Sequence, residues 1–169
     1  MNNAHFVKTF LSAAALSTVL VSSHAFAGPA TYLPGTVCRL ATASLANCAE
    51  YTQYGIQNNC SGGITVECPL PITSNAPAPG AWFATYYAYD RSTTSDVSCT
   101  IQKTDGAGVV VFQSSMNTGG GGAGSGVQNP IFSLSGQSFD GWWRLRCWLP
   151  GVQTAGWPSH ITNITIASF

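Results

Sequence analysis

The chain has 169 residues with six Lys and Arg, six Asp and Glu, and only 7% charged residues. The resulting formal net charge of zero gives the chain no overall basic footprint of the kind that binds nucleic acid or an anionic membrane. Such low charge favours a surface that is packed against something or polar without charge, and it raises the tendency to self-associate.

The N-terminus has the features of a signal peptide. An apolar run from Phe10 to Val21 is followed by Ala25-Phe-Ala27, which fits the small-x-small cleavage rule. The run is too short for a transmembrane helix with its usual flanks, and no later stretch is apolar enough to span a membrane. We expect residues 1–27 to be removed and residues 28–169 to form a single secreted or periplasmic domain. Five Lys and Arg and six Asp and Glu then remain, a net charge of about −1.

After the expected cleavage site, helical periodicity is confined to a possible short turn between Leu40 and Glu50. Short alternating runs separated by Gly, Pro, Asn and Ser predict an all-β fold, a two-sheet antiparallel sandwich of about eight strands. The expected strands are Tyr51–Asn58, Ile64–Cys68, Ala81–Asp90, Val97–Lys103, Gly108–Ser115, Pro130–Ser135, Gly141–Leu149 and Ile161–Phe169. The proline-rich stretch from Pro69 to Gly80 and the glycine-rich stretch from Gly119 to Gly126 are expected loops.

Strand alternation predicts which side chains form the core. The last strand is expected to bury Ile164 and Ile166, whereas residues 81–90 are apolar on both faces. The other side chains expected to point inward are Tyr54, Ile56, Ile64, Val66, Cys68, Leu70, Val97, Cys99, Ile101, Phe132, Leu134, Trp143, Leu145, Cys147 and Leu149.

The outer face of the strand Gly141–Leu149 carries the strongest indication of function. It alternates Trp142, Arg144, Arg146 and Trp148, an arrangement on which sugar rings or a protein partner could stack and form hydrogen bonds. The competing interpretation is that a loop covers the tryptophans and that the arginines pair with Glu67 or Asp140.

All six cysteines lie in the expected mature chain, and their even number behind a signal peptide favours disulfides. Zinc is the weaker alternative because there is no C-x-x-C pair and His160 is the only histidine left; no cofactor is expected. The favoured pairing is Cys38–Cys68, Cys48–Cys60 and Cys99–Cys147. Strand phase leaves a Cys68–Cys147 bridge open.

A set of short motifs follows one another along the chain: Leu33-Pro-Gly-Thr-Val-Cys38, Cys68-Pro-Leu-Pro71, Val97-Ser-Cys99 and Cys147-Trp-Leu-Pro150, with Asn58 and Asp90. Two of them share the pattern Cys-x-Leu-Pro at the end of an expected strand. In these motifs the chain resembles a group of small secreted proteins of Gram-negative bacteria that has no assigned activity. The resemblance covers most of the mature chain and implies a disulfide framework, to which Cys48 and Cys60 are an addition. It supplies no functional residue.

Catalytic chemistry has weaker support than binding. A triad would need a serine with His160 and either Asp140 or Asp90, but no G-x-S-x-G motif is present. Asp90 and Asp96 flank a turn and could bind calcium, although no D-x-D-x-D spacing supports it. The six carboxylates include no pair that the sequence marks for glycoside hydrolysis.

Three function classes follow. The first is a secreted, non-catalytic binding or cell-surface module that takes a glycan or an extracellular protein on its aromatic face. The second is a structural or self-assembling protein that associates through residues 161–169, an uncharged, β-branched segment expected at a sheet edge unless it is buried inside the sheet. The third is a hydrolase.

Overall fold

A computed structural model describes residues 30–72, 82–119, 127–153 and 158–168. The expected signal peptide and most of the two expected loops lie outside these ranges. The described residues form two 3-10 helices, η1 (Gly35–Val37) and η2 (Ala43–Cys48), of which η2 lies where a helical turn was expected. Their strands are β1 (Thr31–Pro34), β2 (Arg39–Leu40), β3 (Ala49–Thr52), β4 (Gly55–Asn58), β5 (Ile64–Leu70), β6 (Trp82–Tyr89), β7 (Ser98–Thr104), β8 (Val110–Asn117), β9 (Val127–Gln128), β10 (Ile131–Ser133), β11 (Trp142–Leu149) and β12 (His160–Ser168).

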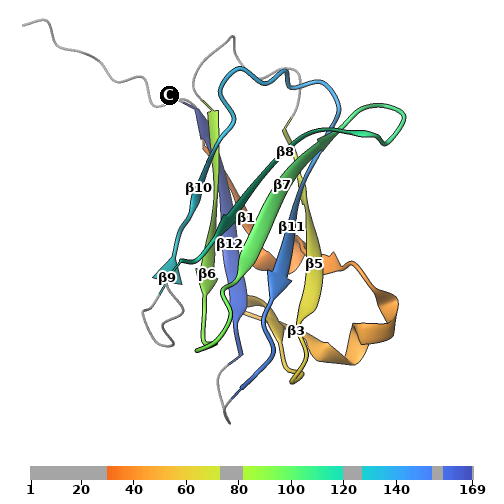
Figure 1. Cartoon of the computed structure of the whole chain (residues 1–169). Coiled ribbons are helices and arrows are strands. Elements are labelled where there is room, and N and C mark those ends of the chain that lie inside the picture. Colours follow the sequence, from red (N-terminus) through yellow and green to blue (C-terminus); the bar gives the residue numbers. More distant parts are fainter. Residues whose placement is uncertain (1–29, 73–81, 120–126, 154–157, 169) are drawn as a thin grey trace, which may run out of the picture.

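The strands form two antiparallel sheets, which confirms the predicted all-β sandwich (Figure 1). The five-stranded sheet has the order β2-β5-β11-β7-β8. The seven-stranded sheet has the order β10-β6-β12-β4-β3, with β1 also paired to β12 and β9 to β6. The strand β11 is central in its sheet because β5 and β7 pair along its two sides.

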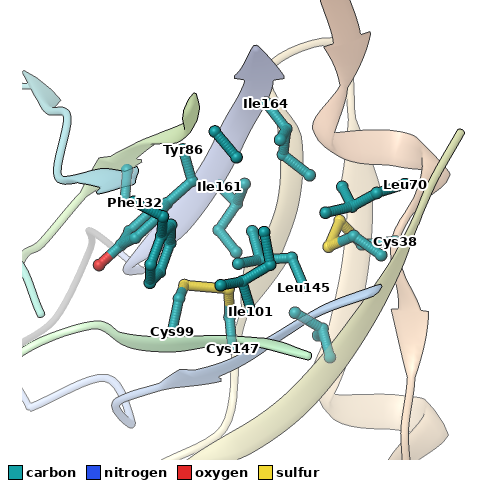
Figure 2. Close-up of a cluster of buried hydrophobic side chains, with 14 of the residues drawn as sticks. Cys38, Leu70, Tyr86, Cys99, Ile101, Phe132, Leu145, Cys147, Ile161 and Ile164 are labelled. Carbon is teal, nitrogen blue, oxygen red and sulfur yellow. A yellow bond between two sulfur atoms is a disulfide. The ribbon is translucent and has the colours of Figure 1, made fainter. Parts of the chain in front are cut away.

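The core lies between the two sheets. Figure 2 shows Tyr86, Phe132, Ile161 and Ile164 facing Ile101, Leu145 and the Cys99–Cys147 bridge. The inward residues of β5 and β11 are buried as alternation predicted: Ile64, Val66, Cys68, Leu70, Trp143, Leu145, Cys147 and Leu149. Because side chains alternate along β11, those on its opposite face lie on the outer surface of the sheet.

Three disulfides close the fold, in the pairing that the sequence favoured. Cys99 and Cys147 are directly opposite on β7 and β11, and they tie the centre of the five-stranded sheet. Cys38–Cys68 fastens the segment after η1 to β5, and Cys48–Cys60 closes the β3–β4 hairpin region. The alternative Cys68–Cys147 bridge is not formed.

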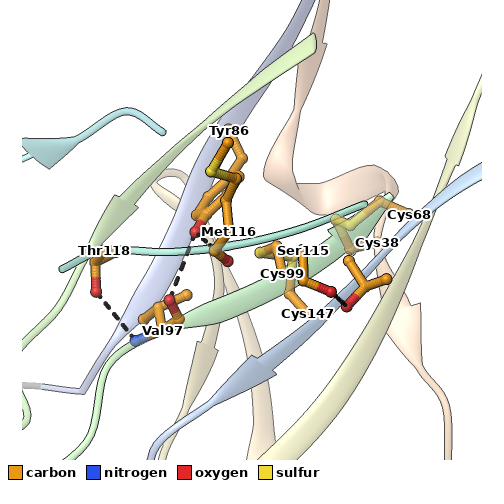
Figure 3. Close-up of a disulfide and its surroundings, with 10 residues drawn as sticks. Cys38, Cys68, Tyr86, Val97, Cys99, Ser115, Met116, Thr118 and Cys147 are labelled. Carbon is orange, nitrogen blue, oxygen red and sulfur yellow. Dashed lines mark hydrogen bonds between the residues drawn. A yellow bond between two sulfur atoms is a disulfide. The ribbon is translucent and has the colours of Figure 1, made fainter. Parts of the chain in front are cut away.

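Buried polar groups join the loops at one end of the sandwich. Asp90 accepts hydrogen bonds from the Val97 N–H at 2.9 Å and the Thr118 hydroxyl at 2.6 Å. The Tyr86 hydroxyl donates to the Met116 carbonyl at 3.2 Å, and Figure 3 shows it pointing from β6 toward Val97 and Met116. Burial, and then the charges of Asp90 and Asp96, raise the pKa of Tyr86, so this phenol stays protonated as a donor.

The expected strand Tyr51–Asn58 is wrong, because residues 49–58 form a hairpin of β3 and β4 instead. Tyr54 lies in the turn with 64% of its surface exposed, whereas Ile56 is buried as expected. Gly55 follows the turn at φ +120°, and a Cβ there would lie 1.8 Å from the Ile161 carbonyl oxygen. Glycine thus permits both the turn and the close approach to β12.

The C-terminal strand does not lie at a sheet edge, which was one of the two positions expected for it. Residues 160–168 lie inside the seven-stranded sheet, with β6 on one side and β1 and β4 on the other. A register shift between Ile161 and Asn163 changes the phase, so Ile161 is buried along with Ile164 and Ile166. Self-association through a free edge at 161–169 is therefore wrong for the described part of this strand, because its backbone groups are already paired.

Candidate functional site

The four residues singled out on β11 lie on the outer face of the five-stranded sheet. Trp142 is 76% exposed and Trp148 38% exposed, so the expectation that a loop covers both tryptophans is wrong for Trp142. The side chains of Arg144 and Arg146 are 38% and 49% exposed. Six residue steps separate the two tryptophans, a distance of about 20 Å along the strand.

Neighbouring strands supply polar groups between the tryptophans. Arg144 Nε donates to Gln102 Oε1 at 2.9 Å, and Glu67 Oε1 lies 3.7 Å from both Arg144 Nη1 and Arg146 Nε. This pairing of both arginines with Glu67 confirms one part of the competing interpretation, in which the arginines form ion pairs within the protein. On the same side of β11 as Gln102, the hydroxyls of Thr100 on β7 and Ser115 on β8 share a hydrogen bond of 2.8 Å.

Two glycines position the tryptophans. A Cβ at Gly63 would lie 2.4 Å from Trp148 Nε1, so the indole of Trp148 rests on this glycine and keeps its other side toward solvent. Gly141 precedes Trp142 at φ +97°, and a Cβ there would lie 2.4 Å from the Thr104 carbonyl oxygen. Larger residues at these two positions would displace the aromatic side chains.

A hollow of about 570 Å³ lies at the Trp142 end of this face, lined by Trp142, Lys103, Asp105, Gly106, Val111, Asp140 and Gly141. Lys103 Nζ donates to Ser138 Oγ at 2.6 Å and to Asp140 Oδ1 at 2.8 Å. The hydrogen bond from Lys103 first, then the hydrogen bond from Ser138 and the charge of Lys103, lower the pKa of Asp140 to about 2. The hollow therefore presents a fixed carboxylate beside an exposed indole at neutral pH.

Sequence reasoning missed several members of this surface. Arg39 lies opposite Glu67 on β2, a two-residue strand that the pattern could not reveal. Thr100 and Gln102 could have been found, because they occupy the outward phase of an expected strand. Lys103 was not predicted to be a functional residue. Its side chain is only 8% exposed and contacts Asp140, which lines the hollow.

In the described part of the chain, no hydrogen bond joins His160 to either aspartate of the triad that the sequence left open. Asp140 pairs with Lys103, and Asp90 accepts hydrogen bonds from Ser92, Val97, Thr118 and Ser159. His160 Nδ1 lies 3.2 Å from the Pro158 carbonyl oxygen, and the ring stacks on Tyr89 at 4.7 Å. A triad would need an aspartate to hold the imidazole, and both candidate aspartates have other partners.

Metal binding has no support in the same region. The two carboxylate oxygens of Asp90 already accept hydrogen bonds from N–H and O–H donors, which leaves them poorly placed for calcium. In the described ranges no group of three or more His, Cys, Asp or Glu residues is arranged to hold a metal ion.

No protein-family model and no curated protein matches this chain. Among solved structures it is similar to the xylan-binding module CBM15, with 8% identity, 83% of this chain and 97% of that chain covered, and a TM-score of 0.48. It is similar to the CBM36-1 domain of a multidomain xylanase from the hindgut metagenome of Trinervitermes trinervoides, with 9% identity, 83% and 98% coverage and a TM-score of 0.45. It is also similar to a family 35 carbohydrate-binding module from Clostridium thermocellum, with 18% identity, 83% of this chain and 99% of that chain covered, and a TM-score of 0.39.

These identities and TM-scores establish neither a common family nor a common ligand.

Across the described segments, no helix has the length and apolar character needed to cross a membrane.

Proposed function

We propose that this protein is a secreted, non-catalytic module that binds glycans on the outer face of its five-stranded sheet. The observation that carries the proposal is the pair of outward-facing indoles, Trp142 and Trp148, with polar side chains between them. Three disulfides fit an oxidising compartment outside the cytosol.

The chemistry of this face suits a sugar chain. The C–H faces of a pyranose ring pack on an indole, and sugar hydroxyls both donate and accept hydrogen bonds. Arg144, Arg146 and Gln102 supply donors, and Glu67 supplies acceptors. A span of about 20 Å along β11 places the two stacking rings so that one extended chain reaches both.

The test is affinity electrophoresis of the mature protein in gels that contain defined polysaccharides. Trp142→Ala and Trp148→Ala should each weaken retention about tenfold, because each removes one stacking platform. Tyr54→Ala is the matched control, since Tyr54 is an exposed aromatic residue in the β3–β4 turn on the other sheet. Retention of both tryptophan variants at the wild-type level, or binding to no glycan, would contradict the proposal.

A second candidate function, self-assembly, is favoured by β8. This strand lies at the edge of the five-stranded sheet and, within the described residues, pairs with β7 alone. Residues 109–117 contain no charge and no proline, and their exposed apolar side chains are Val109, Val110, Val111 and Met116. Edge strands normally carry charge, proline or a cover that blocks pairing with another chain. A second copy of β8 in antiparallel orientation would satisfy the open backbone groups.

Sedimentation over a range of concentrations tests self-assembly. Gln113 is exposed on β8, so Gln113→Lys should reduce association because two like charges would meet across a paired edge. The melting temperature should stay at the wild-type value, since Gln113 lies outside the core. Wild-type protein that remains monomeric at high concentration would remove this candidate.

A further inference from the structure

The cations of this chain are concentrated on the proposed binding face. Five Lys and Arg residues lie in the described ranges, and three of them, Arg39, Arg144 and Arg146, are on the outer face of the five-stranded sheet. Glu67 is the one acidic side chain among them, so this group of four residues carries a charge of +2, three positive and one negative. Asp105 and Asp140 lie outside the group, with Lys103, in the hollow at the Trp142 end. The expected mature chain as a whole carries about −1 (five positive, six negative).

The arginines keep hydrogen-bond donors available. Arg144 and Arg146 approach Glu67 only at 3.7 Å, which is an ion pair without a close hydrogen bond. Glu67 lies in register between Arg39 on β2 and Arg146 on β11. Because directly opposite residues share one face of a sheet, the two guanidinium groups flank one carboxylate on the same surface. A single carboxylate cannot occupy the donor forks of three arginines.

We propose that the ligand is an anionic polysaccharide, whose sugar rings stack on Trp142 and Trp148 and whose carboxylate or sulfate groups accept hydrogen bonds from Arg39 and Arg146. The inference rests on the proposed function, since it names the class of glycan for the same face. Guanidinium groups match planar or tetrahedral oxyanions through paired N–H donors. A neutral glycan would leave this excess of positive charge unused.

The energetics of such a site favour a polymer over a single charged sugar. Exposed ion pairs are individually weak and are screened by salt. A chain that repeats its charge at every sugar or every second sugar places several anions on the face at once, and linked contacts raise the overall affinity. Retention should therefore fall steeply as the salt concentration rises, whereas stacking alone would change little.

The experiment uses polygalacturonate, its methyl ester and dextran sulfate as probes for the mature protein. The methyl ester keeps the sugar backbone of polygalacturonate and removes its charge. Arg39→Gln and Arg146→Gln should each weaken binding to the anionic probes about fivefold. Arg91→Gln is the matched control, because it makes the same change of charge near Tyr89, away from this face. Glu67→Gln should strengthen binding, since it removes the one acidic group among the arginines.

The outcomes separate this inference from the proposed function. Preference for polygalacturonate over its ester supports a carboxylate ligand, and preference for dextran sulfate supports a sulfate ester. Equal tryptophan-dependent binding to the charged polymer and its ester, with no effect of Glu67→Gln, overturns the anionic class and leaves glycan binding standing. Loss of binding in Arg91→Gln equal to that in Arg146→Gln would also overturn it, because the effect would then reflect total charge. Failure to bind any of the probes overturns the inference.

Discussion

At the scale of single residues, Asn58 and Asp90 hold one end of the sandwich together. The Asn58 amide nitrogen contacts the carbonyl oxygens of Gly62, Leu149 and Pro150 at 2.8–3.1 Å, and its oxygen accepts from the Cys60 N–H. The Asn58 N–H donates to the carbonyl of Ser159, whose hydroxyl reaches Asp90. Buried backbone groups that loops leave open are thereby satisfied by side chains.

Replacing Asn58 with alanine should therefore lower the free energy of unfolding by about 3 kcal/mol, because several buried carbonyl groups would lose their donor. Denaturant unfolding of the purified protein measures the change. Asn59→Ala is the control: the Asn59 side chain bonds to Glu50 at the surface, so its loss should cost less than about 0.5 kcal/mol. Equal effects of the two substitutions would contradict this role for Asn58.

His160 should make stability depend on pH. Burial first of all, and the charge of Arg91, lower its pKa from 6.5, against the opposing hydrogen bond to the Pro158 carbonyl. The unfolded chain then binds the proton more tightly than the folded chain. Stability is thus fully present above about pH 6.5 and falls as the pH decreases through the lowered pKa.

We expect the denaturant midpoint to decrease between pH 7.5 and pH 5, and His160→Gln to flatten this dependence. No other histidine lies between residues 28 and 169, so the variant isolates one imidazole. An unchanged pH dependence in His160→Gln would show that another group is responsible.

At the scale of elements, β11 has two different faces that serve two purposes. Its inward face supplies buried Trp143, Leu145, Cys147 and Leu149 to the core, and its outward face supplies the tryptophans and arginines of the proposed site. Pairing with β5 and β7 along its whole length holds the outward side chains on a stiff support. A binding surface on a central strand needs little reordering when a ligand arrives.

The disulfides should differ in their contribution to stability. Cys99–Cys147 spans 48 residues and Cys48–Cys60 spans 12. Loop-closure entropy gives about 4 kcal/mol for the longer loop and about 3 kcal/mol for the shorter one, and removal of the buried Cys99–Cys147 sulfur atoms adds a packing loss. We expect Cys99→Ala with Cys147→Ala to be the more destabilising pair in denaturant unfolding. The reverse order would mean that the β3–β4 hairpin region limits stability.

At the scale of the whole molecule, the three disulfides and the proposed secretion make a joint prediction. The mature protein should begin near Gly28 and should take up no alkylating reagent until it is reduced, after which all six cysteines should react. Intact mass spectrometry before and after reduction measures both. A product that retains residues 1–27, or one labelled without reduction, would contradict secretion through an oxidising compartment.

Local chemistry allowed much of this molecule to be predicted from its sequence. A period of two in side-chain polarity predicted the all-β sandwich, the buried face of β11 and the outward position of Trp142, Arg144, Arg146 and Trp148. Strand phase and cysteine spacing favoured the three disulfides. Alternation is a local property of an extended chain, so it can be read without knowledge of strand partners.

Only the tertiary structure decided the long-range arrangement. The hairpin that exposes Tyr54 depends on the close approach of Gly55 to β12, and the interior place of β12 depends on pairing with β1, more than 120 residues away. Likewise, Arg39, Glu67 and Arg146 come from three strands that meet through register. Strand order and register arise from packing of the whole chain, because each local segment is compatible with several partners.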